Sequence, residues 1–364
     1  MREREQILDL WRQLRADGGS GVLVTVVKTM GSSYRRPGAR LLILGSGKRA
    51  GSISSGCLED DVVKKARWLT EGGPVVRRYD TTPDGEIGPS GEATGGFGLG
   101  CNGIIYLLLQ RVNAGDGIDS PLALLEQVYA NRKAMLIAHV IGPAASAGTR
   151  AVSDAALCGS IATSMVTTVK SGEEVFYETL TPPVRLLIFG AGDDAVPLTA
   201  LGRHLGWQVC VFDGRAHYAR PEKFPLANEV RVRDSNSPLH DMRIDSFSVA
   251  VVMTHSYSQD LNLVGALVKE PLAYLGVLGP RSRCVRLLSD AGIDSATIPS
   301  LHGPVGLDIG ADGPEQVALS IIAEIQATLN GREGGPLRVH SGSIHSRESD
   351  GRSKEQFRPS IVCA

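Results

Sequence analysis

The sequence predicts an α/β protein of two domains, the second of which is built on a doubly wound parallel sheet. The chain has 364 residues, more than one domain usually contains. From residue 184 onward, short apolar runs alternate with helical patterns, as they do in a parallel sheet with crossover helices. The first of these runs leads into a glycine loop, Gly190 to Ala195, with the pattern G-x-G-x-x-G/A.

Composition excludes several classes of protein. Apolar residues make up 42% and charged residues 21% of the chain, the balance of a globular protein. The 38 basic and 39 acidic side chains nearly cancel, so we expect neither nucleic acid nor a membrane as a partner. The longest apolar run, Ile104 to Leu109, is far too short to span a bilayer. Because the N-terminus has no signal-peptide core and the six cysteines include no C-x-x-C pair, we expect a cytoplasmic protein.

The N-terminal domain, residues 1–180, is expected to mix helices and strands in an α+β or α/β arrangement. The apolar residues of its first segment follow the i, i+3, i+4, i+7 spacing of an amphipathic helix: Ile7, Leu10, Trp11 and Leu14. Strands are expected at residues 21–29, 40–44, 75–79, 104–109 and 134–140, and helices at residues 58–69 and 121–132. Residues 142–172 have some β character but no clear pattern, so the sequence assigns them no element.

The segment Thr181-Pro182-Pro183 predicts the boundary between the domains, because two prolines rarely lie inside one element. The second domain, residues 184–330, is expected to have strands at 184–189, 208–212, 248–254 and 273–278, with helices between and after them. Short buried strands separated by helices predict a parallel sheet with right-handed crossovers. Apolar residues become scarce after residue 330, so residues 331–364 are expected to form a tail without fixed structure.

The glycine loop has the context of a Rossmann-type nucleotide-binding loop. Gly190 and Gly192 directly follow an apolar strand, and the loop opens a helix. Asp213 closes the next strand, about 20 residues on, where this fold usually places a ribose-binding acid. Asp193 and Asp194 oppose a conventional dinucleotide, because carboxylates at a helix N-terminus repel a pyrophosphate. The sequence therefore predicts the Rossmann-like fold and leaves open whether a nucleotide binds, alone or with a bridging cation.

More polar residues are predicted at the carboxyl edge of the same sheet, where open α/β sheets bind ligands. His255 follows the third of the expected strands, and Arg281 and Arg283 follow the fourth. Asp308 precedes the last helix. Any one of these would more often be a helix cap or a salt bridge, but together they favour a pocket at this edge.

A loop in the N-terminal domain, residues 31–38 (GSSYRRPG), concentrates small residues and charge. Ser32 and Ser33 supply hydroxyls, and Arg35 and Arg36 supply guanidinium groups. Such a loop can offer backbone donors and bidentate arginine contacts to an anion. A solvated turn is the alternative, and it explains the arginines but not the run of small residues.

Two cysteines lie next to glycine in loops. Gly56-Cys57 is expected at the start of a helix, where the dipole stabilises a thiolate, although three acidic residues that follow oppose this effect. Gly100-Cys101 lies within a glycine cluster, which makes Cys101 a candidate ligand for a soft metal. A lone cysteine is more often a small core residue, and that alternative stays open.

Several segments together carry a family resemblance. In the N-terminal half they are GSSYRRPGA, GSISSGCLED and GLGCNG. In the C-terminal half they are LLIFGAGDDAVPL, LGWQVCVFDGR, MTHSYSQDL, LGVLGPRSR and PVGLDIGADGPEQVALSIIAEI. These segments, in order over roughly residues 5–330, resemble the XdhC/CoxI family of maturation factors for molybdenum hydroxylases.

The resemblance implies a protein that binds molybdenum cofactor (molybdopterin) and supports its sulfuration. A protein of this family is then expected to deliver the cofactor to an apo molybdenum hydroxylase such as xanthine dehydrogenase or carbon monoxide dehydrogenase. We therefore expect a cofactor-insertion chaperone rather than a catalyst, a homo-oligomer, and a cysteine desulfurase as a second partner. By motif, the cofactor-handling positions are Ser32, Ser33, Arg35, Arg36, Gly56, Cys57, Gly100 and Cys101, with Cys101 as the candidate molybdenum ligand. The second site comprises Gly190, Gly192, Asp193, Asp194, Asp213, His255 and Arg281.

Two other functions stay open at this point. An NAD(P)-dependent oxidoreductase would use the Rossmann loop, but the sequence offers no clear catalytic set for it and the N-terminal loops would have no role. A metal-assisted hydrolase would use Asp193, Asp194 and His255. The identity of the client enzyme does not follow from the sequence.

Overall fold

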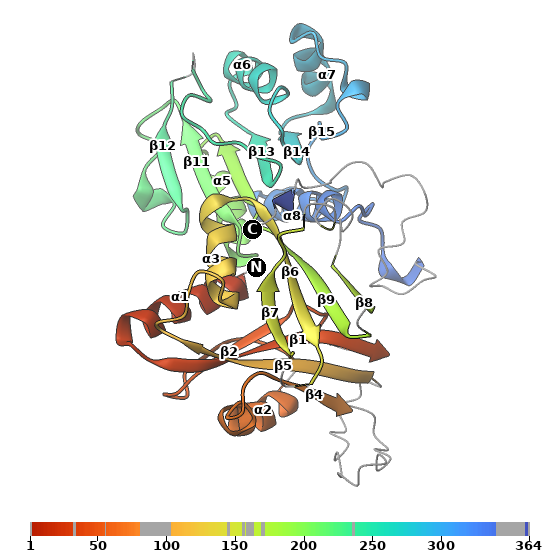
Figure 1. The fold of residues 1–364 in the computed structure, drawn as a ribbon. Helices are drawn as coiled ribbons and strands as arrows, with labels where there is room; N and C mark the ends of the chain where they lie inside the picture. The colour runs from red at the N-terminus through yellow and green to blue at the C-terminus, as the bar shows by residue number, and fades with distance from the viewer. Residues whose placement is uncertain are drawn as a thin grey trace. The chain divides into compact units, whose positions relative to one another are not determined.

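The computed structural model describes residues 2–31, 34–54, 56–80, 103–143, 146–154, 157, 164–168, 172–234, 237–339 and 361–362. The chain divides into two compact units. One comprises Glu3–Pro182 with Ser360–Ala364, and the other comprises Pro183–Pro359 with Met1–Arg2. The first unit contains mostly antiparallel sheets and the second a parallel one, which confirms the predicted α/β class (Figure 1).

The N-terminal unit contains two sheets and three helices. Its helices are α1 (Arg2–Asp17), α2 (Cys57–Leu69) and α3 (Pro121–Asn131). The first sheet has the order β3-β2-β1-β5-β4, from strands β1 (Ser20–Gly31), β2 (Arg40–Leu44), β3 (Arg49–Gly51), β4 (Val75–Asp80) and β5 (Gly103–Asn113). The second sheet has the order β16-β6-β9-β8, with β7 paired to β6. Its strands are β6 (Ala134–Ile141), β7 (Gly148–Ala151), β8 (Met165–Thr168), β9 (Glu174–Leu180) and β16 (Ile361–Val362).

The first sheet buries both of its faces, because side chains alternate along its strands. Val22 and Val24 of β1 pack with Leu58 of α2 on one face. Leu23, between those valines, packs with Trp11 of α1 on the other face. Each of these fully buried side chains contributes roughly 1.5–3 kcal/mol by leaving water. The helical spacing read from the sequence therefore identifies the buried stripe of α1.

The register of β1 against β5 positions the loops of this unit. The two strands pair antiparallel along their length, from Ser20 opposite Asn113 to Gly31 opposite Gly103. Both strands are longer than the sequence predicted. The loop that follows Gly31 therefore leaves the sheet beside Gly103, the first residue of β5.

The C-terminal unit has a parallel sheet of six strands in the order β12-β11-β10-β13-β14-β15. In chain order this is the 3-2-1-4-5-6 arrangement of dinucleotide-binding Rossmann folds. The strands are β10 (Arg185–Phe189), β11 (Gln208–Asp213), β12 (Glu229–Val232), β13 (Ser248–Val252), β14 (Tyr274–Val277) and β15 (Leu301–His302). The helices are α5 (Ala195–His204), α6 (Tyr257–Leu267), α7 (Arg281–Asp290) and α8 (Pro314–Leu329), with short 3-10 turns η1 (Pro221–Lys223), η2 (Ser295–Thr297) and η3 (Leu337–Val339).

Helices cover both faces of this sheet. Helices α5 and α8 pack on one face around Leu198 and Ile321 (Figure 1). Helices α6 and α7 pack on the other around Val264 and Leu287. Burial on both sides explains why β13 reads as a continuous apolar run rather than as an alternating one.

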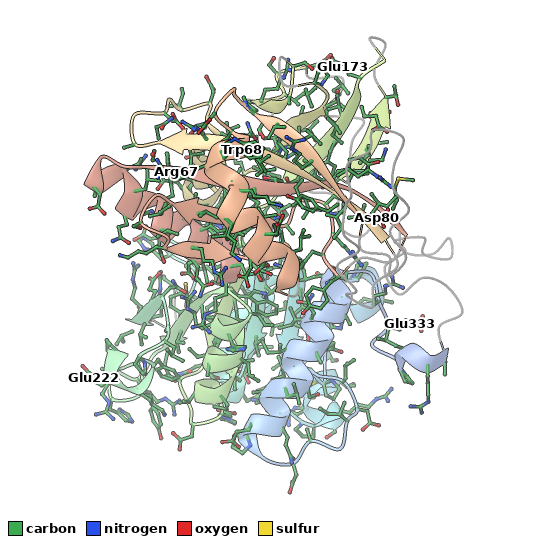
Figure 2. The ribbon with its side chains drawn as sticks, turned by 90° about the horizontal axis from the view of Figure 1, so that it is seen from below. Arg67, Trp68, Asp80, Glu173, Glu222 and Glu333 are labelled. Carbon is green, nitrogen blue, oxygen red and sulfur yellow. The ribbon has the colours of Figure 1, made fainter. Side chains whose placement is uncertain are left out.

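Three features differ from the sequence-based expectations. Between β11 and β12 the structure has the turn η1, which contains Glu222 (labelled in Figure 2), and no helix among the residues it describes there. The edge strands β12 and β15 were not predicted, since they are short and only partly buried. The segment 142–172, to which the sequence assigned no element, contains two strands of the second sheet, β7 and β8.

The C-terminal segment also differs from its prediction. Residues 337–339 form η3, and Ile361–Val362 pair in parallel with Ala134 and Met135 of β6. For these residues the prediction of a tail without fixed structure is wrong. Strand pairing with β6 supplies order that the composition alone did not indicate.

Candidate functional site

The glycine loop after β10 depends on close packing against the end of β13. Gly190 has a φ of 123°, a conformation that L side chains rarely adopt. A Cβ on Gly190 would lie 2.2 Å from the carbonyl oxygen of Met253. A Cβ on Gly192 would lie 2.6 Å from Oδ1 of Asp194. Gly190 is therefore required by local geometry, whether or not a ligand approaches it, whereas a side chain at Gly192 would only displace the carboxylate of Asp194.

Asp213, at the end of β11, uses its carboxylate within the protein. Oδ2 accepts a hydrogen bond from the backbone N–H of Ala191 at 2.8 Å and one from Nη2 of Arg215 at 2.9 Å. Oδ1 accepts two more, from the backbone N–H and Nε of Arg215, both at 2.9 Å. Burial alone would raise the pKa of Asp213, but these bonds outweigh it and lower the pKa. A carboxylate has about four acceptor positions, so those of Asp213 are filled by one bond from the glycine loop and three from Arg215.

Asp193 is compensated by a neighbouring cation. Its side chain is 95% exposed, and Oδ1 lies 2.7 Å from Nζ of Lys223. That hydrogen bond lowers the pKa of Asp193. The same ammonium donates to the carbonyl oxygen of Ala191 at 2.9 Å. The negative potential that the sequence predicted at this turn is therefore reduced by Lys223.

Asp194 pairs with His255. Nε2 of His255 lies 3.2 Å from Oδ2 of Asp194. Oδ1 of Asp194 is buried and has no hydrogen-bond partner in the described part of the chain. His255 has a φ of 61°, in the left-handed region, and its side chain is 62% exposed. The structure thus brings two of the residues predicted for the second site into contact.

The two arginines after β14 have different roles. Nη2 of Arg283 donates to Oδ2 of Asp260 at 2.6 Å, and Asp260 is completely buried. Oδ1 of Asp260 accepts from Oγ1 of Thr254 at 2.6 Å. Arg283 is therefore part of the framework of this edge. Arg281, the first residue of α7, and Asp308 are both exposed.

A recess opens beside this edge, and sequence reasoning missed it. Its volume is about 320 Å³, including space open to solvent. The residues that line it include Phe212, Gly214, Arg233, Thr254, Gln259 and Leu263. They come from the ends of β11, β12 and β13 and from α6, so only the folded sheet brings them together. The segment MTHSYSQDL did carry a signal, because it contains both Thr254 and Gln259.

In the N-terminal unit, Arg35 joins two of the predicted loops. Its Nε and Nη2 donate to the carbonyl oxygen of Ser52 at 3.2 and 3.1 Å, and Nη2 also pairs with the carboxylate of Glu3. The loop after β1 is therefore tied to the segment before α2. Arg36, by contrast, is exposed. Arg35 therefore has a structural role. The sequence alone had treated Arg35 and Arg36 alike, as ligands for an anion.

The segment before α2 holds one of the protein's own carboxylates. Oε1 of Glu59 accepts from the backbone N–H groups of Ile53 and Ser54 at 2.9 and 3.0 Å, and from Oγ of Ser52 at 2.7 Å. These donors could have served an external anion, and Glu59 occupies them instead.

The start of α2 remains open. Gly56 is its N-cap, has a φ of 132° and offers no side-chain hydrogen bond to the first turn. Among the residues that the structure describes, none places an atom within 4 Å of a Cβ built on Gly56. Cys57 is the first residue of the helix. Four other residues predicted for this site lie outside the described residues: Ser32, Ser33, Gly100 and Cys101.

A buried polar network beside these loops was also missed by the sequence analysis. Arg40 of β2 forms two hydrogen bonds with Glu178 of β9, at 3.0 and 2.6 Å. Nε2 of His139 lies 3.0 Å from Oε2 of Glu178, and Nδ1 lies 2.8 Å from Oγ1 of Thr149. Burial alone would raise the pKa of Glu178, but Arg40 and His139 hold it well below its usual value. The network joins the two sheets of this unit, and Arg40 also donates to the carbonyl oxygen of Gly38 at 2.9 Å.

Within the described ranges, no group of three or more His, Cys, Asp or Glu side chains is arranged to hold a metal ion. Over the same residues, none of the helices combines the length and apolar character needed to cross a membrane.

Known proteins resemble this chain over most of its length. It is 30% identical over 325 residues to a protein of Bacillus subtilis (strain 168) that is named as a probable subunit of xanthine dehydrogenase, covering 86% of this chain and 95% of that relative. It is 26% identical over 314 residues to the molybdenum cofactor insertion chaperone PaoD of Escherichia coli (strain K12), covering 85% of this chain and 83% of that relative. A crystal structure of a xanthine dehydrogenase from Bacillus halodurans matches with a TM-score of 0.70 and 26% identity, over 91% of this chain and 98% of the other.

Family models match both halves of the chain. The model described as the XdhC and CoxI family matches residues 14–80, and the model described as the XdhC Rossmann domain matches residues 186–325. The second match coincides with the six-stranded parallel sheet and its helices. Since both models match in chain order and the Bacillus subtilis relative is aligned almost completely, this chain belongs to the XdhC/CoxI family.

Proposed function

We propose that this chain binds molybdenum cofactor and acts in the maturation of a molybdenum hydroxylase, as a binding protein rather than a catalyst. The similarity to an insertion chaperone over 85% of this chain supports this function. So do the relatives described as xanthine dehydrogenase or as a probable subunit of it, since they connect the family with that hydroxylase.

The structural observation that carries the proposal is the open start of α2. Molybdopterin has a phosphate, and the start of α2 offers it outward-pointing N–H groups, although Glu59 and Asp60 in the first turn oppose an anion. Gly56 is the cap of this helix, with open space around its α-carbon. The exposed Arg36 lies on a loop that Arg35 ties to the segment before this helix, and adds positive charge.

Two cysteines are proposed for the metal of the cofactor. Cys57 begins α2, a position where the helix dipole favours a thiolate. Thiolates are ligands for soft metals, and we propose Cys101 as the thiol that contacts molybdenum, with Cys57 as a weaker second thiol. The cofactor would supply the metal chemistry of the client enzyme, while this chain's residues bind it and shield it from solvent.

We further propose that the chain holds the cofactor during sulfuration by a cysteine desulfurase and passes it to an apo-hydroxylase of the xanthine dehydrogenase type. A homo-oligomer is part of the same proposal. The Rossmann-like unit would contribute a second binding site around Gly190, Asp194 and His255. A nucleotide is a candidate ligand there, because Lys223 compensates the charge of Asp193 next to the glycine loop.

The test uses the full chain purified from cells that make molybdenum cofactor. Pterin fluorescence of the denatured protein and molybdenum by elemental analysis should both show bound cofactor, and the loaded protein should activate an apo-hydroxylase. Absence of pterin and molybdenum would contradict the proposal. NAD(P)H turnover linked to a substrate would instead favour an oxidoreductase.

A further inference from the structure

The loop that carries Arg35 and Arg36 ends in a tight turn. The backbone N–H of Ala39 donates to the carbonyl oxygen of Arg36 at 3.1 Å, which closes a turn of four residues. Pro37 and Gly38 occupy its two central positions, and Gly38 has a φ of 93°. Proline followed by a residue of positive φ is the pattern of a type II turn. The turn therefore fixes the direction in which the chain leaves Arg36.

The buried pair of Arg40 and Glu178 contacts this turn directly. Nη1 of Arg40 donates both to the carbonyl oxygen of Gly38 at 2.9 Å and to Oε1 of Glu178 at 3.0 Å. A Cβ on Gly38 would lie 3.0 Å from the same Oε1, so the carboxylate lies against the α-carbon of the turn. The N–H of Gly38 in its turn donates to the carbonyl oxygen of Val26 in β1 at 2.7 Å. The position of Gly38 is therefore held by β1 and by the ion pair together.

The remaining members of the buried network bind Glu178 or one another. Nε2 of His139 lies 3.0 Å from Oε2 of Glu178, and the ring of His139 stacks on that of Phe176 with 5.5 Å between the ring centres. Oγ1 of Thr149 lies 2.8 Å from Nδ1 of His139 and donates to Oε1 of Gln110 at 2.6 Å. His139 thus holds the carboxylate in place, and Thr149 and Gln110 hold His139.

Stability alone is a weak reason for burying the charges of Arg40 and Glu178. Their side chains are only 2% and 3% exposed. Taking both charges out of water costs much of what their attraction returns, and apolar residues of similar volume often give an equally stable core. Nε of Arg40 is also buried without a hydrogen-bond partner in the described part of the chain. Geometry is the better explanation, because a planar guanidinium with fixed donors determines where the carbonyl group of Gly38 lies.

We propose that Arg40 and Glu178 are positioning residues for the loop of residues 31–38, and that they hold its final turn so that Arg36 is presented to an anionic ligand. The inference rests on the proposed function, in which Arg36 adds positive charge to the cofactor site. Arg40 and Glu178 are buried and act through the backbone of Gly38 rather than on the ligand. Arg35 ties the same loop to the segment before α2, so the loop is held at two points.

The test replaces the triad of Arg40, His139 and Glu178 by apolar residues of similar size in the full chain, as Arg40→Met/His139→Phe/Glu178→Met. A phenylalanine at position 139 can keep the stacking on Phe176. Because no buried charge of the triad is left unpaired, stability in urea unfolding should stay close to that of the wild type. Thr149→Val is the matched control, since it cuts the network between His139 and Gln110 and leaves the contacts of the turn in place.

Limited digestion with trypsin reports the state of the loop directly. Trypsin can cut the bond after Arg35, whereas Pro37 protects the bond after Arg36. Cutting requires Arg35 to leave the carbonyl oxygen of Ser52, so the rate follows the population of the open loop. Measured by mass spectrometry against cleavage after the exposed Lys269 of the C-terminal unit, this rate should be about tenfold higher in the triple variant, since the turn loses a hydrogen bond from a charged donor.

The wild-type rate of cleavage after Arg35 in the triple variant would overturn the proposal. So would an equal increase in Thr149→Val, because loss of any part of the network would then have the same effect. Arg40→Lys replaces the triple variant in this comparison if the latter does not fold. It keeps the positive charge but lacks the planar fork that contacts Gly38 and both oxygens of Glu178, so it too should be cut faster than the wild type.

Molybdenum content separates this inference from the proposed function. The folded triple variant should carry less cofactor than the wild type, since a smaller fraction of the protein has the loop in its binding conformation. Faster cleavage after Arg35 with full cofactor occupancy would contradict the positioning role and leave the proposed function standing. Wild-type protein without cofactor, together with faster cleavage in the triple variant, would contradict the proposed function and leave the hold of the triad on the turn in place.

Discussion

Nε2 of His255 lies 3.2 Å from Oδ2 of Asp194, and this contact joins the loop after β13 to the glycine loop after β10. The two strands are neighbours in the sheet, at the point where the strand order reverses. His255 keeps a left-handed backbone with a φ of 61°. Left-handed geometry is costly for a residue with a Cβ, and the contact with Asp194 offsets part of that cost.

The first prediction separates the side chain of His255 from its backbone. His255→Ala should lower the free energy of unfolding by about 1 kcal/mol, because Asp194 loses its partner in a partly exposed pair. His255→Gly loses the same contact but relieves the backbone, so it should be more stable than His255→Ala by about 1 kcal/mol. Urea unfolding of both variants gives the comparison. Equal stability of the two would mean that the left-handed backbone stores no strain.

The second prediction concerns Asp213. Asp213→Ala leaves the N–H of Ala191 and the guanidinium of Arg215 without their acceptor, so it should lower the free energy of unfolding by about 2–3 kcal/mol. Arg215→Ala should cost less, since its side chain is 38% exposed. Thermal unfolding measures both. If Asp213 acts only on a ligand, the Asp213→Ala protein will unfold at the wild-type temperature.

The third prediction distinguishes Arg35 from Arg36. Arg35→Ala removes the contacts with Ser52 and Glu3 and should lower the free energy of unfolding by about 1 kcal/mol. Arg36→Ala should leave stability within about 0.5 kcal/mol of the wild type, because the side chain is exposed. It should reduce cofactor occupancy, measured by molybdenum content. A stable Arg36→Ala protein with full occupancy would remove Arg36 from the proposed site.

The fourth prediction is the pH dependence of stability from Glu178. Its pKa in the folded protein is below the usual 4.5, so the unfolded state takes up the proton first as the pH falls. The stability contributed by the ionised Glu178 is therefore complete above about pH 4.5 and is lost as the pH falls toward the folded-state pKa.

Glu178→Gln provides the measurement for that pH dependence. The variant should be about 3 kcal/mol less stable than the wild type at neutral pH, because it breaks a buried pair with Arg40. The difference should shrink below about pH 4.5 in urea unfolding series. A difference that stays constant down to about pH 3 would mean that the ionised carboxylate is not its cause.

The fifth prediction concerns the cysteines. Cys101→Ser should keep the fold, lose molybdenum cofactor and fail to activate an apo-hydroxylase, because a hydroxyl is a poor ligand for a soft metal. Cys210→Ser is the control, since Cys210 is buried in the sheet of the C-terminal unit. Iodoacetamide should label Cys101 early, and bound cofactor should slow that labelling. Full cofactor occupancy in Cys101→Ser would mean that the thiol is not a ligand and that the arginine and glycine loops alone bind the cofactor.

The sequence by itself determined the elements whose signal is local. The spacing of Ile7, Trp11 and Leu14 identified the buried side of α1, and the apolar run before Gly190 identified β10. These signals are readable because side-chain periodicity reflects burial on one helix face or within a sheet. The glycine loop and the acid at position 213 indicated the Rossmann-like order for the same reason, since both belong to one strand–helix–strand unit.

Only the tertiary structure decided what those residues do. Asp213 has the position of a ribose-binding acid, but its partners Ala191 and Arg215 occupy its oxygens. Arg35 and Arg36 are adjacent residues of the same type. Arg35 has a structural role because the fold places the carbonyl oxygen of Ser52 within its reach. Gln259 and Phe212 face one recess although they belong to different elements. Hydrogen-bond partners and cavities arise from segments far apart in the chain, so no local pattern records them.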